Sequence, residues 1–515
     1  MMNLVFGLSP FLAVGFGALL LMIAEALGRP APDAEGVTPE GVVLDAGSGR
    51  APELALVSAV ILFAGAVLSV SLWMIGPEHL EGLQAVAPYL LIDRFSVFFA
   101  FVLCLGGGLA ALLAGGYLPE HRIDRSEYFP LLLLSTFGAM ALAASGDLLS
   151  LFIGLETMSL GVYCLIGLRR GSQRAAEAAV KYFLLGSFAA ALTLFGAALL
   201  YGATGHTDLV GIGKAISSIG QAGSVVSTPT VLIAVVLVIA GLAFKVSAVP
   251  FHMWTPDAYE GAPTPTTTYM AVAVKAAAFA ILLRVLLVAF GDPRLMSWGS
   301  GWPPVIALLA VLTMTVANVI ASRQESVKRM LAYSSIAHAG YILIGVVAAM
   351  RGAEGQESVL FYLLAYTVST AGAFGALILC GRRGAEAVSY DDLAGLGKRH
   401  PAAALAFSLF LLSLAGIPPT IGFFGKLYVI RAAIDSQLYV LAIIGLLNSV
   451  VGAYYYLRVM VYMYFREPAP GAPQATPMRS GMVTAALIIA AVLVLALGIL
   501  PGASLEMVVG AVAGG

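Results

Sequence analysis

The stretch GLAFKVSAVPFHMWTPDAYEGAPTPTTTYM, residues 241–270, decides how this chain folds. It continues an apolar run of membrane-spanning length, yet it contains Pro250, Pro256, Pro263 and Pro265. Proline removes a backbone donor and interrupts the hydrogen-bond ladder of a helix. In lipid, the freed backbone groups need partners on neighbouring helices or water in a cavity. The stretch therefore predicts a broken membrane helix that is enclosed by protein.

A second stretch, LAGIPPTIGFFGK at residues 414–426, repeats the pattern, with Pro418 and Pro419 shortly before Lys426. The first break lies next to Lys245 in the same way. Two interrupted helices five spans apart predict two related halves of five spans each, inverted relative to one another. The alternative is a pair of unrelated proline kinks, which are common in membrane helices.

Composition places the whole chain in the membrane. Of its 515 residues, 60% are hydrophobic and 11% charged, whereas a soluble domain carries about 25% charged residues. The apolar runs are long enough for helices and too long for barrel strands. We therefore expect an all-α membrane protein of about fourteen transmembrane helices, two of them broken. The predicted spans are residues 5–27, 53–75, 92–117, 127–145, 147–168, 176–202, 229–250, 263–290, 303–322, 327–350, 357–381, 401–433, 437–465 and 480–502.

These spans predict four parts. Residues 1–126 hold three helices with a polar loop at 28–52, residues 127–290 and 303–465 form the two five-helix repeats, and residues 480–515 hold a last helix. The first apolar run has no basic leader, so we expect a retained helix and not a cleaved signal peptide. Lysine and arginine concentrate in the loops after odd-numbered spans. The positive-inside rule then places those loops in the cytoplasm and both termini outside.

Charged side chains within the apolar spans carry the functional prediction. A charge at bilayer depth costs at least ~2.5–3.5 kcal/mol. A buried lysine, whose charged form is disfavoured, can gain and lose a proton. We therefore expect a protein that moves protons or another small cation through the membrane. The charged residues are Glu156, Lys181, Lys245, Lys275 and Lys426.

Two of these lysines differ in their expected surroundings. We expect Glu156 and Lys245 to form an ion pair, which lowers the insertion cost of both. The alternatives are a protonated or hydrogen-bonded glutamate and a lysine that is solvated at the break or extends to the interface. Lys275 lies near the middle of its span, with no carboxylate in reach on its own helix. We expect it to be buried and linked to water.

Other polar residues have weaker signals. Lys181 follows Glu177 by four residues, so a helical surface pair competes with a role in proton transfer. His252 and His338 suit a proton relay because histidine titrates near neutral pH. The alternative for each histidine is a hydrogen-bonded contact between helices. Arg284 lies late in its span, where we expect its side chain to extend to the interface.

Several functions are disfavoured. Cys104, Cys164 and Cys380 lie on separate segments without CxxC or Cys/His spacing, so we expect small buried side chains and no Fe–S cluster or metal on this chain. The net charge of −1 suggests no nucleic-acid partner. No nucleotide loop, haem-binding pair or nucleophilic triad is evident. Energy for transport must come from an ion gradient or a partner.

Four long motifs closely resemble the antiporter-like membrane subunits of respiratory complex I, NADH-quinone oxidoreductase. Among those paralogues, the SSIAHAGY string and the short C-terminus are most similar to the N subunits. M subunits usually have glutamate at the position of Lys426. The motifs are GLETMSL (154–160) with KYFLLGSFAAALTLFG (181–196), FKVSAVPFHMWTPDAYEGAPTPTTTYM (244–270), QESVKRMLAYSSIAHAGYILIG (324–345) and LAGIPPTIGFFGK (414–426).

The resemblance implies a site and an assembly. Glu156 and Lys245 match the ion pair of a first half-channel, Lys275 a central lysine and Lys426 the second half-channel, while Lys181 and His252 match accessory positions. It also implies that NADH, FMN, Fe–S clusters and quinone are bound by other subunits. The chain itself would lie among further antiporter-like subunits in the bilayer of a bacterial inner membrane.

Two alternatives stay open at this point. The same module serves multisubunit cation/proton antiporters and membrane-bound hydrogenases. A protein of another class, a purely structural membrane spacer, would tolerate removal of the charge at Lys275 or Lys426, because a lone buried charge is a cost.

Overall fold

The chain is described here by a computed structural model that covers residues 2–28, 36–37, 43–44, 50–123, 125–169, 171–219, 227–381, 384–471 and 474–513. The predicted loop at 28–52 falls largely outside these residues. Within it, β1 (Gly36–Val37) and β2 (Val43–Leu44) form a short antiparallel pair.

The first half of the described chain is helical. Its elements are α1 (Met2–Gly7), α2 (Ser9–Gly28), α3 (Ala51–Ile75), η1 (Pro77–His79), η2 (Leu83–Ala85), α4 (Arg94–Glu120), α5 (Tyr128–Ala143), α6 (Leu148–Ile166), α7 (Gln173–Thr204), α8 (Leu209–Ser217), α9 (Thr228–Lys245), α10 (Trp254–Gly261), α11 (Thr264–Tyr269), η3 (Met270–Val274), α12 (Lys275–Arg284) and η4 (Val285–Ala289). The elements η3 and η4 are π-helical turns that continue the span from α11 through α12.

The second half continues in the same style. Its elements are α13 (Pro303–Ala321), α14 (Val327–Ala348), α15 (Ala353–Leu379), η5 (Asp391–Leu393), α16 (Leu396–Arg399), α17 (Pro401–Ala415), α18 (Ile421–Asp435), α19 (Tyr439–Phe465), α20 (Gly481–Ile499) and α21 (Gly502–Ala513). Every predicted span contains helix, whereas α8, α10, α16 and α21 are helices that the span pattern did not predict.

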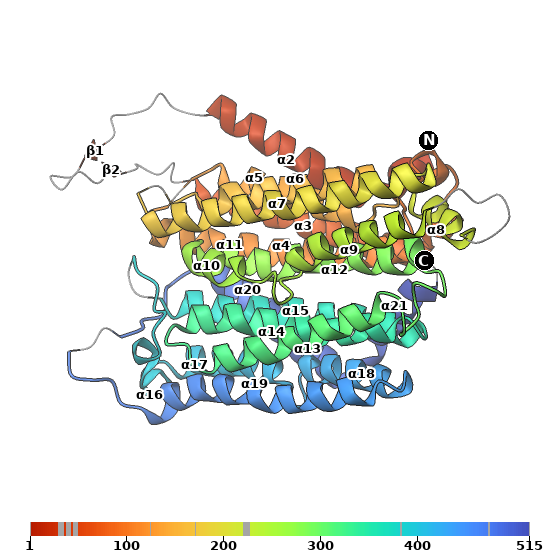
Figure 1. Cartoon of the computed structure of the whole chain (residues 1–515). Coiled ribbons are helices and arrows are strands. Elements are labelled where there is room, and N and C mark those ends of the chain that lie inside the picture. Colours follow the sequence, from red (N-terminus) through yellow and green to blue (C-terminus); the bar gives the residue numbers. More distant parts are fainter. Residues whose placement is uncertain are drawn as a thin grey trace.

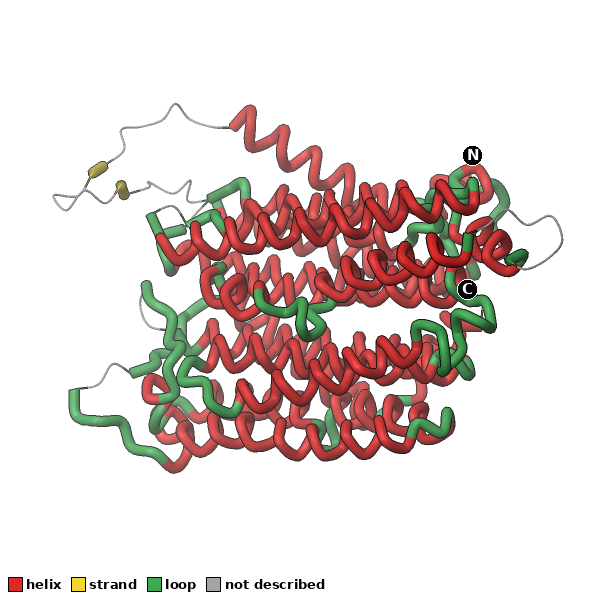
Figure 2. The backbone as a smooth tube through the Cα atoms, in the orientation of Figure 1, coloured by secondary structure: helices red, strands yellow, loops and turns green. Residues whose placement is uncertain are grey.

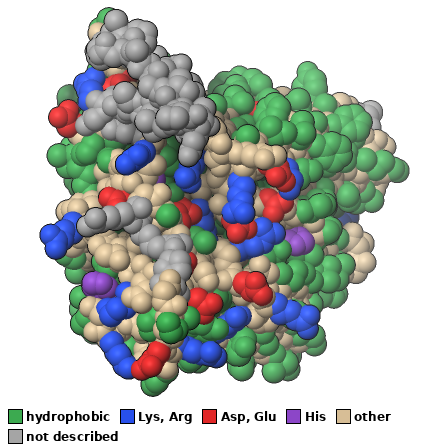
Figure 3. Space-filling model, turned by 90° about the vertical axis from the view of Figure 1, so that its left-hand side faces the viewer, with side chains coloured by type: hydrophobic (Ala, Val, Ile, Leu, Met, Phe, Trp, Pro, Cys, Tyr) green, Lys and Arg blue, Asp and Glu red, His purple; other side chains and the backbone are tan. Residues whose placement is uncertain are grey.

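The helices run roughly parallel, with α2 to α12 in one half of the bundle and α13 to α19 in the other (Figures 1 and 2). Both termini lie at one end. The opposite end carries α16 and the end of α10 (Figure 1). Figure 3 looks onto that opposite end, where charged side chains are scattered over the surface and hydrophobic ones cover the adjoining flank.

Among the described residues, twelve helices are long and apolar enough to cross a membrane. The helix α5 is shorter, with 16 residues, and α17 and α18 have 15 residues each. The helices α4, α14 and α15 are almost wholly buried, whereas α2, α7, α19 and α20 leave broad apolar faces exposed. The chain therefore has a shielded interior layer in which polar chemistry can be kept away from lipid. Cys104 and Cys380 are buried as expected, but Cys164 is exposed.

Both predicted helix breaks are observed. The helix α9 ends at Lys245, and the chain turns before α10 begins at Trp254. The freed backbone groups find side-chain partners, because Trp254 Nε1 donates to the Phe244 carbonyl at 3.1 Å and Val249 N–H donates to Thr313 Oγ1 at 2.9 Å. These bonds make irregular backbone tolerable at membrane depth.

The second break separates α17, which ends at Ala415, from α18, which begins at Ile421. Gly416 follows α17 with φ of +84°, in the left-handed region that favours glycine at a helix end. Gly422 N–H donates to Ser413 Oγ at 3.3 Å across the break.

Candidate functional site

Lys245 occupies the first break. As the last residue of α9 it is 2% exposed, and its Nζ donates to Ser159 Oγ on α6 at 2.9 Å. The ring centroids of Tyr163, Tyr182 and Phe244 lie 5.4–5.6 Å from Nζ, which is within range of cation–π attraction. Nζ also donates to the Tyr163 hydroxyl at 3.5 Å, so the ammonium group is held by two hydroxyl groups and a cage of aromatic rings.

Glu156 does not form the direct ion pair that we predicted. Its carboxylate is close enough to Lys245 for an electrostatic interaction, but no contact within ion-pair distance joins the two side chains, and Glu156 Oε1 is buried without a hydrogen-bond partner. The reason lies in Ser159, one turn later on α6, whose hydroxyl takes the place of the carboxylate against Lys245 Nζ.

Lys275 lies deep in the bundle. It is the first residue of α12, directly after the π-helical turn η3, and it is 2% exposed. Its Nζ donates to both the carbonyl and the hydroxyl of Ser335 on α14. The Tyr366 ring centroid lies 5.4 Å from Nζ, and the Tyr366 hydroxyl donates to Ser335 Oγ at 2.8 Å. The predicted burial of Lys275 is thus confirmed.

His338 lies one turn further along α14 and is 4% exposed. Its Nδ1 is 2.7 Å from the Tyr362 hydroxyl and its Nε2 is 3.0 Å from the Tyr456 hydroxyl. The Tyr456 hydroxyl also bonds to Ser334 Oγ. Both ring nitrogens therefore face titratable or exchangeable hydroxyl groups and not apolar side chains.

Lys426 belongs to the second break. Its Nζ donates to the Ala415 carbonyl at 2.8 Å and to Ser449 Oγ on α19 at 2.9 Å. The Ala415 carbonyl is one of those that the end of α17 leaves without a helical partner, and a cation at that end is stabilised by the helix dipole. The Tyr341 ring centroid lies 5.3 Å from Nζ.

One face of α14 joins these groups. Ser335, His338 and Tyr341 follow each other at intervals of three residues, so they line the same side of the helix. The first contacts Lys275 and the last contacts Lys426. Lys245 and Lys275 are buried and Lys426 is half-buried, and we call these three residues the lysine row. In the described chain, none of the three has a carboxylate within ion-pair distance. The structure therefore gathers amines that are solvated by hydroxyl, carbonyl and aromatic groups.

Lys181 is placed differently from our prediction. Its side chain is 44% exposed, and it forms the i,i+4 pair with Glu177 at 2.7 Å and a second pair with Asp257 at 2.9 Å. The alternative of a helical surface pair is confirmed. Lys181 points away from the lysine row because its neighbour Tyr182 takes the inward position beside Lys245.

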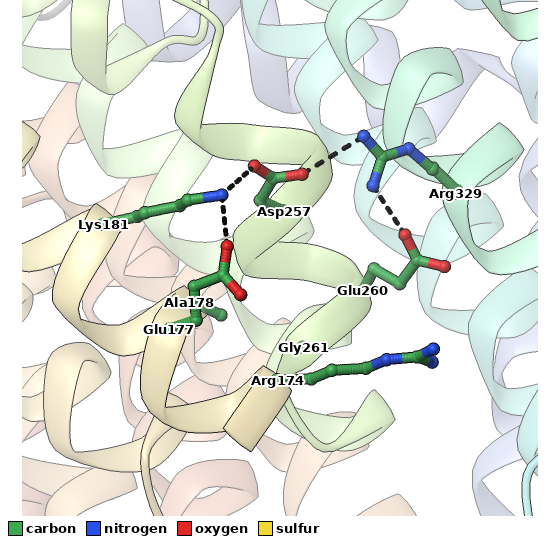
Figure 4. A pocket seen from close by; sticks show the side chains of 8 residues that line it. All are labelled: Arg174, Glu177, Ala178, Lys181, Asp257, Glu260, Gly261 and Arg329. Carbon is green, nitrogen blue, oxygen red and sulfur yellow. Dashed lines mark hydrogen bonds and ion pairs between the residues drawn. The ribbon is translucent and has the colours of Figure 1, made fainter. Parts of the chain in front are cut away.

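The Asp257 carboxylate, which pairs with Lys181, also contacts the second half of the protein. Arg329 of α14 contacts Asp257 at 3.1 Å and Glu260 at 2.6 Å, and with Lys181 they line a pocket of about 300 Å³ (Figure 4). Arg174 also points into this pocket (Figure 4). Burial acts to raise the pKa of Asp257, but Lys181 and Arg329 together hold it below its ordinary value of 3.8.

His252 is half-buried in the turn between α9 and α10, and its Nδ1 has no hydrogen-bond partner in the described chain. No hydrogen bond or ion pair within the described residues joins it to the lysine row. Its role as a relay stays a prediction.

Two buried ion pairs escaped sequence reasoning. Arg284 does not extend to the interface, because it is 7% exposed and binds Asp93 at 2.7 and 3.0 Å. Lys328 is 1% exposed in its side chain and contacts Glu386 at 3.0 Å. The partners are far apart in sequence, so local spacing carried no signal for either pair. Among the described residues, no group of three or more His, Cys, Asp or Glu side chains is arranged to hold a metal ion.

The comparisons with known proteins agree with this geometry. Residues 145–452 match the family described as NADH:quinone oxidoreductase/Mrp antiporter, TM. The chain is 66% identical over 506 residues to NADH-quinone oxidoreductase subunit N 1 of Sorangium cellulosum (strain So ce56), covering 98% of this chain and 97% of that protein.

Two solved structures share the fold. A chain of respiratory complex I from Thermus thermophilus with bound aureothin has a TM-score of 0.75 and 33% identity, covering 96% of this chain and 98% of that chain. A chain of the Mrp complex from Dietzia sp. DQ12-45-1b has a TM-score of 0.79 at 23% identity, covering 100% and 97%, and shows the fold alone.

A bundle with two broken helices and a row of enclosed lysines defines an antiporter-like membrane subunit. Both breaks and the lysine row fall within residues 145–452, which match the family. The chain belongs to the family of NADH:quinone oxidoreductase and Mrp antiporter transmembrane subunits, and within it to the N subunits of NADH-quinone oxidoreductase.

Proposed function

We propose that this chain translocates protons as a membrane subunit of a proton-pumping NADH:quinone oxidoreductase, through Glu156, Lys245, Lys275 and Lys426. The observation that carries the proposal is the set of three enclosed lysine amines without carboxylate partners among the described residues. Each contacts a serine hydroxyl that can pass a proton on. The assignment to this complex, and not to a free-standing antiporter, rests on the 66% identity to an N subunit over nearly the whole chain.

The physical case rests on the cost of burial. An isolated ammonium in a low-dielectric interior is unfavourable, so its charged and neutral forms are brought closer in free energy. A lysine in that condition accepts a proton when a neighbouring carboxylate ionises and releases it when a neighbouring cation arrives. Hydroxyl groups and internal water supply the steps between them.

The proposed path begins near Glu156 and Lys245. Protons enter there from the cytoplasmic side, pass Lys275 and then His338, and leave on the side of Lys426. Support comes from one face of α14. Along it, Ser335 contacts Lys275, His338 contacts the Tyr362 hydroxyl, and Tyr341 contacts Lys426. Lys181 and His252 are accessory in this scheme, with Lys181 part of the charged pocket above the first break.

The proposed architecture has fourteen spans, with the inverted repeats at residues 127–290 and 303–465. The twelve long helices, together with α5 and the broken pair α17–α18, would account for that number. An even number of spans agrees with termini at one end of the bundle (Figure 1). The distribution of lysine and arginine favours termini on the periplasmic side of the bacterial inner membrane in which we propose that the chain lies.

Electron transfer belongs to other subunits in this proposal. NADH, FMN, Fe–S clusters and quinone would be bound outside this chain, and the energy of quinone reduction would reach it through contacts with neighbouring membrane subunits. The experiment on partners is purification from native membranes. NADH dehydrogenase subunits should co-purify, whereas the isolation of antiporter proteins or a hydrogenase alone would contradict the proposal.

A double-mutant cycle tests the coupling of Glu156 and Lys245. We expect Glu156→Gln and Lys245→Met each to leave the complex assembled and to lower NADH-driven proton pumping by roughly tenfold or more, the order that one positioned proton-transfer group contributes. Because both groups serve one step, the double variant should pump no worse than the poorer single variant. The measurement is quenching of a pH-sensitive dye in vesicles that contain the purified complex.

Thr157→Val is the matched control on α6, since Thr157 neighbours Glu156 but makes no hydrogen bond to Lys245. Its pumping should equal that of the wild type. Losses that multiply in the double variant would mean that Glu156 and Lys245 act independently.

A further inference from the structure

A groove of about 590 Å³ lies away from the lysine row, between the start of α17 and the start of α20. Its walls are mostly small or apolar. Alanine side chains hollow out the α17 side, and longer apolar side chains form the α20 side. The main wall residues are Ala402, Ala403, Ala406, Leu487, Ile488 and Ala491.

Positive charge is confined to one end of the groove. Arg399 and His400 line it immediately before α17 begins. The guanidinium of Arg399 is fixed by two backbone carbonyls, those of Ala475 at 3.2 Å and Ala394 at 3.0 Å. Its Nε is buried without an acceptor, and no carboxylate of the described residues pairs with it. A fixed, uncompensated guanidinium is suited to an anion.

The start of α17 adds to this positive end. Pro401 is its first residue, and no side chain caps it. The first backbone N–H groups of a helix lack partners within the helix, and the helix dipole favours negative charge there. A phosphate group fits such a position.

We propose that this groove binds an anionic phospholipid, with its phosphate at Arg399, His400 and the start of α17 and an acyl chain between α17 and α20. The apolar wall on α20 runs from Thr484 to Ala491, a rise of about 10 Å. That length matches much of the depth of one leaflet, about 15 Å. The charged end and the apolar wall thus have the order of a phospholipid molecule.

The test uses the purified complex in phosphatidylcholine nanodiscs that contain a small fraction of phosphatidylglycerol with a photoreactive acyl chain. After illumination, mass spectrometry of peptides should locate labels on α17 and α20. We expect Arg399→Gln to lower this labelling roughly fivefold, the effect of losing one basic residue at a membrane surface. Ala406→Phe should also lower it, because the ring occupies the groove without changing the charge.

Lys398→Gln is the matched control, because Lys398 is the adjacent basic residue but is exposed and paired with Glu467 outside the groove. Its labelling should equal that of the wild type. Three outcomes would overturn the proposal. They are unchanged labelling in both Arg399→Gln and Ala406→Phe, equal labelling by a photoreactive phosphatidylcholine, and a groove that is covered by a neighbouring subunit in the intact complex.

Discussion

The variant Lys275→Met should assemble normally and lose proton pumping. The substitution keeps an unbranched side chain of similar length but removes the amine that binds the carbonyl and hydroxyl of Ser335. Because Lys275 lies between the two helix breaks in the proposed path, its loss interrupts transfer along the whole row. We expect NADH-driven pumping to fall by roughly tenfold or more, measured by dye quenching in vesicles that contain the purified complex.

The stability of the same variant separates a functional lysine from a structural one. An ammonium that is 2% exposed and has no carboxylate partner in the described chain opposes folding. Lys275→Met should therefore unfold at the same temperature as the wild type or at a higher one. If the chain were only a structural spacer, Lys275→Met would have this unchanged or raised unfolding temperature and would also pump fully. Full pumping would therefore refute the assignment of Lys275 to proton transfer. The control is Lys214→Met on α8, an exposed lysine away from the row, which should leave both quantities unchanged.

The variant Glu386→Gln should destabilise the protein by about 3 kcal/mol, because it leaves Lys328 as an uncompensated buried charge. Lys328 Nζ donates to Glu386 and to the Ala262 carbonyl, at the end of α10 and beside the start of α11. Thr264 and Tyr117 also donate to the Glu386 carboxylate. One carboxylate therefore joins α4, α11 and α14. The measurement is thermal unfolding of the purified complex with a thiol-reactive dye.

The double variant Glu386→Gln/Lys328→Met supplies the control. Removing both charges should restore most of the lost stability, since the buried cation is then absent. If the double variant were as unstable as the sum of the single variants, the hydrogen bonds and not the charge of Lys328 would hold this junction.

The contribution of Glu386 should also depend on pH. Burial acts to raise the pKa of Glu386, but Lys328 and the hydroxyl groups of Thr264 and Tyr117 outweigh it and hold the pKa below its ordinary value of 4.5. A carboxyl group with a lowered pKa in the folded state stabilises the protein above its ordinary pKa and loses that contribution as the pH falls through the lowered one. The difference in unfolding temperature between wild type and Glu386→Gln should therefore be constant at neutral pH and shrink under acid conditions.

Local sequence rules predicted the features that depend on local chemistry. Proline clusters located both breaks, because proline acts on its own turn of helix. Apolar run length located the helices that hold Lys275 and His338, and the absence of a carboxylate on the same helix correctly indicated a buried amine at Lys275. The short helix α8 was missed because its nine residues are too few for a span.

Features that depend on tertiary packing could not be predicted in this way. Arg284 was expected at the interface, yet its partner Asp93 lies 191 residues earlier in the chain. Lys245 contacts Ser159 directly, and not Glu156, because of the way α6 and α9 are rotated against each other. The spacing of residues within one helix does not indicate how that helix is rotated against its neighbour.

The alignment of Ser335, His338 and Tyr341 along α14 has a mechanical consequence. These residues span about 9 Å of one stiff rod, with one lysine held near each end of the row. A rotation of α14 about its long axis would displace the contacts of all three residues at once. Lys275 could therefore not lose its contact with Ser335 while the contact between Lys426 and Tyr341 stays unchanged. The Lys275 and Lys426 sites, which lie in opposite halves of the molecule, are therefore mechanically coupled through the single helix α14.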